Sequence, residues 1–332
     1  MLRNRFIIFV LSILLFSCNN NKFDVDISNI DLDLDIKRLD KDLFQNYPDT
    51  PNVEKLRQEY GKFLDLYSLG VIGIGSPQSE RYKDALMQFQ KYCIEYRIPE
   101  KTDSVFSNID DISFKLTNAL KHYKYYFPEK QIPNIYTFIS AFNQSVVVDE
   151  GMIGIALDKY LGRNCVYYKQ LGWDKYKIRR MEKSMIPVDV MRALAIMEFP
   201  YADSIDNLLN QMVYEGKIQY FLDAMLPNAP DSLKFAYTEA QWEWADYNEE
   251  KMWAYLVESE TLFSTDHMTI RKFIGDAPFT QVFHNNSCPR AGVFLGWKIV
   301  NKYMDKHPNS TLKQLMENND YQGILNSANY RP

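Results

Sequence analysis

Apolar residues recur every three to four positions along much of the chain, and this spacing predicts a mostly helical protein. In the first half, the pattern indicates helices within residues 52–70, 79–96 and 110–127. In the second half, it indicates four long helices and a short terminal one, within residues 186–200, 207–227, 238–264, 287–308 and 310–330. Thr238 is the expected N-cap of the third long helix. Ser287 is the expected N-cap of the fourth, with Pro289 in its first turn.

Two regions follow the period of strands instead. Apolar and acidic residues alternate through Leu32, Leu34 and Ile36, and the chain is expected to enter a helix near Asp40. Short β-rich runs separated by turn residues then occupy residues 135–142, 144–150 and 152–162. We therefore expect an α+β fold, predominantly helical, with a small sheet of three strands and the early run as a fourth. The glycine-rich stretch at 69–79 lacks the lysine of a phosphate loop and is expected to be an inter-helix loop.

The first 17 residues have the features of a lipoprotein signal peptide. Two arginines precede an apolar run from Phe6 to Phe16, which is too short to span a bilayer, and Ser17 precedes Cys18. Cys18 is the expected lipidation site and would anchor the mature chain to a membrane through acyl chains. The alternative is an ordinary secretory peptide with an accidental cysteine. We expect residues 18–29 to be a polar tether and residues 30–332 to be one domain, with a strand and helical section at 30–127 and the sheet and long helices at 128–332.

Composition and charge exclude several kinds of function. A formal net charge of −5 provides no basic field for nucleic acid, so no nucleic-acid partner is expected. The four histidines are scattered without the i, i+4 spacing of a zinc helix, and we expect no metal and no other cofactor. The many aromatic residues are expected to fill helix packing, with a glycan-stacking surface as the alternative.

Residues 207–227 raise the question of a catalytic site because polar side chains interrupt an apolar helix. Glu215 followed by Gly216 resembles the turn of the helix that carries the third ligand in some zinc peptidases. The preceding helix, however, carries Asp189 and Arg192 where the metal-binding pair would stand, and these residue types form ion pairs. We therefore expect a vestigial cleft filled by hydrogen bonds, made by Asp189, Arg192, Gln211, Tyr214 and Glu215.

A second candidate is a tryptophan-rich segment with an acidic rim. Trp242, Trp244, Glu249 and Trp253 share the expected helix 238–264 and are a candidate partner surface, because tryptophan is enriched at interface hot spots. The favoured alternative is a buried stripe with solvated carboxylates, formed by Trp242, Ala245, Met252, Trp253 and Leu256. In the next helix, Gly292 and Gly296 stand one turn apart and are expected to let a neighbouring helix approach closely.

Several of these segments together resemble the GldB family of gliding-motility lipoproteins from Bacteroidetes. The resemblance rests on "LLNQMVYEGKIQYFLDAMLP", the tryptophan segment, "FIGDAPFTQVF", "PRAGVFLGWKIVNKYM", "IALDKYLG" and "IKRLDKDLF". It implies a zincin-like architecture without the zinc-binding histidines. It also implies a non-enzymatic lipoprotein of the cell envelope that binds other envelope proteins of the gliding or secretion machinery.

Two further expectations concern placement and activity. "NNNKFD" after Cys18 lacks the acidic run of a surface-export signal, so we expect the protein to face the periplasm. The alternative functions are a metal-dependent, peptidase-like hydrolase with Glu215 as its acid, and a glycan-binding lipoprotein.

Overall fold

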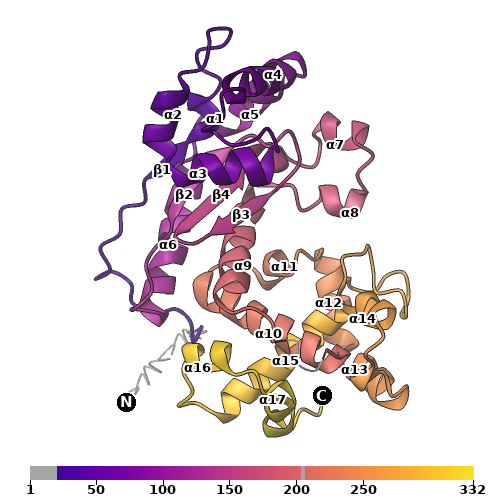
Figure 1. Cartoon of the computed structure of the whole chain (residues 1–332). Helices are drawn as coiled ribbons and strands as arrows, with labels where there is room; N and C mark the ends of the chain where they lie inside the picture. The colour runs from indigo at the N-terminus through magenta and orange to yellow at the C-terminus, as the bar shows by residue number, and fades with distance from the viewer. Residues whose placement is uncertain (1–20, 203–205) are drawn as a thin grey trace, which may run out of the picture.

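The computed structural model describes residues 21–202 and 206–332 (Figure 1). The predicted signal peptide and Cys18 lie outside the described residues. The elements of the first half are β1 (Ile36–Arg38), α1 (Leu39–Asp42), α2 (Val53–Tyr60), α3 (Lys62–Asp65), the π-helix η1 (Leu66–Val71), α4 (Tyr82–Glu95), α5 (Ile98–Phe106), α6 (Asp110–Tyr126), β2 (Asn134–Phe138), β3 (Val146–Asp149) and β4 (Met152–Ala156). Those of the second half are η2 (Leu157–Lys159), α7 (Val166–Gln170), α8 (Lys175–Ile178), η3 (Lys183–Met185), α9 (Ile186–Glu198), α10 (Leu208–Met225), α11 (Asp231–Lys234), α12 (Glu239–Tyr247), α13 (Glu249–Glu258), η4 (Thr261–Phe263), α14 (His267–Ile274), α15 (Ala291–Lys306), α16 (Leu312–Glu317) and α17 (Tyr321–Ala328).

The predicted α+β class is confirmed, and a fourth strand does join the sheet, but β1 covers Ile36–Arg38, so of the alternating run through Leu32, Leu34 and Ile36 only Ile36 lies in it. The strand order is β1-β2-β4-β3, with β1, β2 and β4 parallel and β3 antiparallel at one edge. Figure 1 draws α2, α4 and α5 above the sheet, α3 across it, and α9 and α10 below it. Gly154 explains the close cover on one face: a Cβ there would lie 2.7 Å from the Phe63 ring, which stacks on Tyr136 of β2 at a centroid distance of 4.0 Å.

Two helices cross at glycines in the second half. A Cβ on Gly216 of α10 would lie 2.3 Å from the backbone carbonyl of Gly296 in α15, and a Cβ on Gly296 would lie 1.7 Å from the carbonyl oxygen of Met212. Only glycine permits this approach. The expected close packing at Gly292 and Gly296 is therefore confirmed. The glycine of the "EG" pair, Gly216, is therefore explained by the crossing of α10 and α15.

The helix at 238–264 was predicted as one element, and this is wrong. Thr238 does cap α12, in a capping box with Gln241, but the helix stops at Tyr247 and α13 starts at Glu249. Asn248 lies at the break, and its side-chain amide donates to the carbonyl of Trp244 at 2.8 Å. An asparagine side chain that bonds the preceding turn competes with continuous helix, which explains the interruption.

The predicted start of the next helix is also wrong. α15 begins at Ala291, after Arg290 in the left-handed region at φ 52°. The first-turn amide of Ala291 donates to Thr280 Oγ1 at 3.0 Å, so a residue eleven positions earlier caps the helix in place of Ser287. Pro289 lies before the helix. The terminal segment, expected to hold one short helix, forms α16 and α17. The pattern also missed the short helices α5, α7, α8, α11 and α14.

The start of the described chain is packed against the domain. Asn21 Nδ2 donates to the carbonyl of Pro227 at 2.7 Å, and Phe23 is buried edge-on against Tyr220 of α10 at a centroid distance of 4.9 Å. Lys22 pairs with Asp305 of α15 at 3.1 Å. Part of the expected tether is thus held to the surface near the C-terminal end of α10. None of the helices in residues 21–202 and 206–332 has the length and apolar character needed to cross a membrane.

Candidate functional site

The centre of the expected cleft is an ion pair between α9 and α10. Arg192 Nη2 donates to both oxygens of Glu215, at 2.9 and 2.8 Å, and both side chains are largely buried. Burial lowers the pKa of Arg192, but the Glu215 carboxylate outweighs it, so the pKa lies above its ordinary value. Arg192 Nη1 is buried and has no hydrogen-bond partner among the described residues. Glu215 is therefore held by a guanidinium, with one donor of that guanidinium left free.

Asp189 lies one turn before Arg192 in a second polar network. Tyr160 donates its hydroxyl to Asp189 Oδ2 at 2.9 Å, and Arg180 Nη2 approaches Oδ1 at 3.5 Å. Arg180 also pairs with Asp276, at 3.2 Å. Burial raises the pKa of Asp189 above its ordinary value in spite of these partners.

On α10, the side chains of Gln211 and Tyr214 bond to the segment that connects α9 to α10. Gln211 Nε2 donates to Asp206 at 2.9 Å, and the Tyr214 hydroxyl donates to the carbonyl of Phe199 at 3.1 Å. Both bonds fasten the connection between α9 and α10. The structure therefore brings Asp189, Arg192 and Glu215 together, and it uses Gln211 and Tyr214 to hold the ends of the two helices.

These residues do not fit a zinc ion. Zinc in a catalytic site takes three convergent nitrogen, sulfur or carboxylate ligands, and a ligating carboxylate cannot keep a guanidinium on both of its oxygens. Within the described parts of the chain, no three His, Cys, Asp or Glu side chains are grouped so as to hold a metal.

An open cleft of about 390 Å³ adjoins the two networks. Its wall combines residues of β3, α8 and α9 with Asp276, and cations outnumber carboxylates in it: the charged members are Lys159, Lys177, Arg180, Arg192, Asp189 and Asp276. Lys159 lies with Nζ 3.9 Å from the centre of the Trp173 ring and donates to the carbonyl of Phe142 at 3.2 Å. Burial lowers the pKa of Lys159. Sequence reasoning missed Tyr160, Arg180 and Asp276, since no spacing connects these distant positions.

The open edge of β3 borders this cleft at Val146. Val147 is paired with Gly154 of β4, and the Ala156 amide donates to the carbonyl of Ser145 at 2.8 Å. In an antiparallel pair, hydrogen-bonded positions alternate, so Ser145, Val147 and Asp149 share the bonds with β4. The backbone groups of Val146 and Val148 therefore point away from the sheet.

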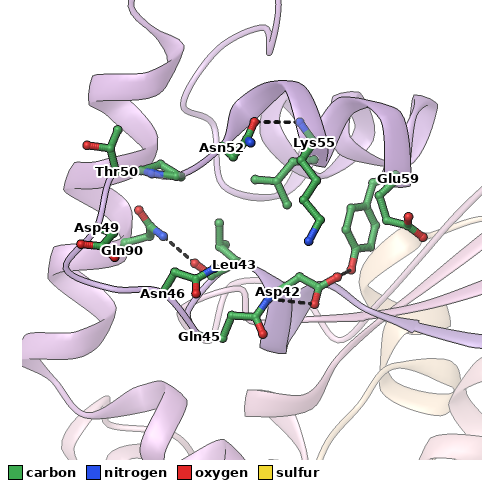
Figure 2. A pocket seen from close by; sticks show the side chains of 13 residues that line it. Asp42, Leu43, Gln45, Asn46, Asp49, Thr50, Asn52, Lys55, Glu59 and Gln90 are labelled. Carbon is green, nitrogen blue, oxygen red and sulfur yellow. Dashed lines mark hydrogen bonds between the residues drawn. The ribbon is translucent and has the colours of Figure 1, made fainter.

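A separate pocket of about 250 Å³ lies between α1, α2 and α4 (Figure 2). Tyr60 donates its hydroxyl to Asp42 at 2.6 Å, and the Asn52 side chain accepts from the Lys55 amide at 3.0 Å. Gln90 donates to the carbonyl of Leu43. Figure 2 shows Asp42, Asn52 and Gln90 around the opening, each in a hydrogen bond with another residue of the pocket lining, and the arrangement supports the local fold.

The residues of the tryptophan segment are partly buried and face the core. Trp242 packs edge-on against Phe294 and Trp297, Trp244 packs against Phe283, and Trp253 packs edge-on against Tyr330. Glu249 accepts from the Tyr330 hydroxyl at 2.7 Å and pairs with Lys298 at 2.9 Å. The outward aromatic residues of α12 and α13 are Tyr247, which is 81% exposed, and Tyr255, which is 39% exposed.

One comparison with known proteins assigns the chain. The family model described as "Gliding motility protein GldB" matches residues 20–332, which is nearly the whole chain. This chain belongs to the GldB family. It is accordingly a gliding-motility lipoprotein by family, and the family is not a known enzyme family. The comparisons with curated proteins and with solved structures return no match.

Proposed function

We propose that this GldB-family protein is a non-enzymatic, lipid-anchored protein of the cell envelope that binds an extended segment of another envelope protein. Cys18 is its anchor and the folded domain faces the periplasm. The observation that carries the proposal is the antiparallel edge strand β3 beside a cleft in whose lining cations outnumber carboxylates.

An unpaired strand edge offers a row of backbone donors and acceptors to an incoming chain. The backbone groups of Val146 and Val148 supply that row here. A partner segment added at this edge would run past Lys177, which pairs with Asp174 at 3.1 Å, and past Arg180, which pairs with Asp189 and Asp276. Carboxylates on the segment would share these cations with the present partners.

Recovery of envelope proteins with the lipoprotein tests this proposal. Val148→Pro removes an outward backbone donor without removing a bond to β4 and should lower recovery of the bound partner several-fold. Val148→Thr keeps the donor and should behave as wild type. Equal recovery with both variants would refute strand addition at β3.

A matched charge reversal on α8 tests the cleft separately. Lys175 and Lys177 are both exposed, but only Lys177 lines the cleft. Lys177→Glu should lower partner recovery by about ten-fold, because one reversed charge at a binding surface changes the free energy by about 1–2 kcal/mol. Lys175→Glu should leave it unchanged. If both reversals act alike, general surface charge would explain the binding.

The tryptophan segment remains a second proposed contact for the same function. The inner side of this segment packs against the core through Trp242, Trp244, Glu249 and Trp253. The side chains that a partner would contact are Tyr247 and Tyr255 on its outer side. Tyr247→Ser should reduce partner recovery without changing thermal stability. Unchanged recovery would remove this segment from the proposed interface.

A further inference from the structure

A pocket of about 370 Å³ with mostly apolar walls lies away from the cleft, between α6, the start of α9 and the segment that follows α10. Its floor and walls include Ala119, Val188, Met225, Leu226 and Leu233. Leu226, Pro227 and Ala229 border it in a short proline-rich connection between α10 and α11. The volume falls in the range of small-molecule sites, roughly 300–1,000 Å³, which are also lined mainly by apolar side chains.

The rim of this pocket carries an exposed aromatic residue. Phe114 of α6 lines the pocket and is 67% exposed, with Lys115 beside it in the same lining. A solvent-facing phenylalanine next to a lysine suits the boundary between a bilayer and water, where the ring contacts chains and the ammonium contacts phosphate. On the inner side, His122 is 5% exposed, and its Nδ1 bonds the carbonyl of Asn118 at 2.8 Å.

The first described residues indicate where the membrane lies relative to the pocket. Asn21 is bonded to the carbonyl of Pro227, a residue that lines the pocket. Cys18 is three residues earlier, so the anchor lies within about 10 Å of Asn21 even if the connection is fully extended. A membrane that holds acyl chains on Cys18 would therefore lie close to Pro227, one of the residues that line the pocket.

We propose that this pocket binds a fatty-acyl chain of a phospholipid from the membrane that holds the anchor. The chain enters past Phe114 and lies among Val188, Leu226 and Leu233, and the lipid phosphate contacts Lys115. Each methylene that leaves water contributes about 0.8 kcal/mol, so four buried methylenes correspond to about a 200-fold gain in affinity. This inference rests on the lipid anchor proposed above, and it is independent of the partner-binding edge.

Titration of the unlipidated mature chain tests the proposal. The Cys18→Ser protein is titrated by calorimetry with monomeric dodecanoyl lysophospholipid below its micelle concentration. We expect 1:1 binding, weakened at least ten-fold by Ala229→Trp, which places a large ring in the opening. Phe114→Ser, a surface change, should also weaken binding, and Phe263→Ser, a similar change at an exposed phenylalanine of η4, should not.

Each other outcome overturns the inference in a distinguishable way. Absence of binding, or binding by both the Ala229→Trp and the Phe114→Ser variants as tight as that of the unsubstituted pocket, would show that the pocket holds no acyl chain. Equal affinity for dodecanoate would identify a free fatty acid as the ligand. Binding by the Cys18→Ser chain but not by the lipidated protein would mean that the protein's own anchor fills the pocket. None of these results depends on recovery of an envelope protein with the lipoprotein. The lipid titration and the partner-recovery experiment can therefore fail independently of one another.

Discussion

Replacing Glu215 by glutamine should destabilise the protein strongly, because it leaves Arg192 charged and buried without its carboxylate. The guanidinium lies 2.8–2.9 Å from both Glu215 oxygens, and the two side chains are only 21% and 12% exposed. Exposed pairs contribute about 0–1 kcal/mol, whereas breaking a buried pair costs about 3–5 kcal/mol. For this pair we expect a loss of about 3 kcal/mol in the free energy of unfolding.

Denaturant unfolding of a double-mutant cycle measures this loss. Arg192→Met combined with Glu215→Gln removes both charges, so the double variant should recover part of the stability that Glu215→Gln loses. Glu100→Gln is the matched control, because Glu100 pairs with Arg97 at 2.5 Å on the exposed surface, and it should unfold like wild type.

Metal content is measured on the same samples to separate a structural role from a catalytic one. A Glu215→Gln protein as stable as the Glu100→Gln control would refute the ion-pair account. Stoichiometric zinc in chelator-free wild type that disappears with Glu215→Gln would support the metal-dependent hydrolase instead.

Two further predictions concern packing and pH. Gly296→Ala should lower the free energy of unfolding by about 1–3 kcal/mol through overpacking, because the added Cβ meets the backbone of Met212. Gly70→Ala, whose Cβ lies 3.6 Å from a leucine side chain, should be tolerated, and equal melting temperatures of the two variants would contradict the helix crossing. Burial raises the pKa of Asp158 to about 6, from an ordinary value of 3.8. The protonated group therefore adds up to about 3 kcal/mol to the free energy of unfolding at low pH, and this contribution is lost as the pH rises from about 4 to about 6. The Asp158→Asn variant should lack that component of the stability–pH curve, and parallel curves would refute the assignment.

Local patterns predicted the elements that depend on neighbours in sequence. The long helix α10 has the expected span and ends before Pro227, and Thr238 caps α12 as its spacing with Gln241 indicates. Strands β2, β3 and β4 were likewise visible as short β-rich runs, whereas β1 lies at the end of the run where the fourth strand was expected. These features follow from period, capping and turn residues, which act over a few positions.

Features that depend on distant contacts were not accessible in this way. The pairing of Arg180 with Asp276 joins residues far apart along the chain. The capping of α15 by Thr280, the contact of Arg180 with Asp189 and the position of β3 at the sheet edge depend on how the segments pack, which no periodic pattern specifies. The ion pair of Arg192 was anticipated from residue types, but its partner Glu215 became evident only when α9 and α10 were packed together. The single-domain division of residues 30–332 stays a prediction.

Photo-cross-linking at the β3 edge tests the central claim most directly. A benzoylphenylalanine is placed at Val148 in cells that make the lipidated protein, and covalent adducts are identified by mass spectrometry. We predict a discrete adduct with an acidic, extended segment of an envelope protein, lost with Lys177→Glu and retained with Lys175→Glu. The absence of any adduct at Val148, or adducts indifferent to Lys177, would contradict binding at this strand and cleft.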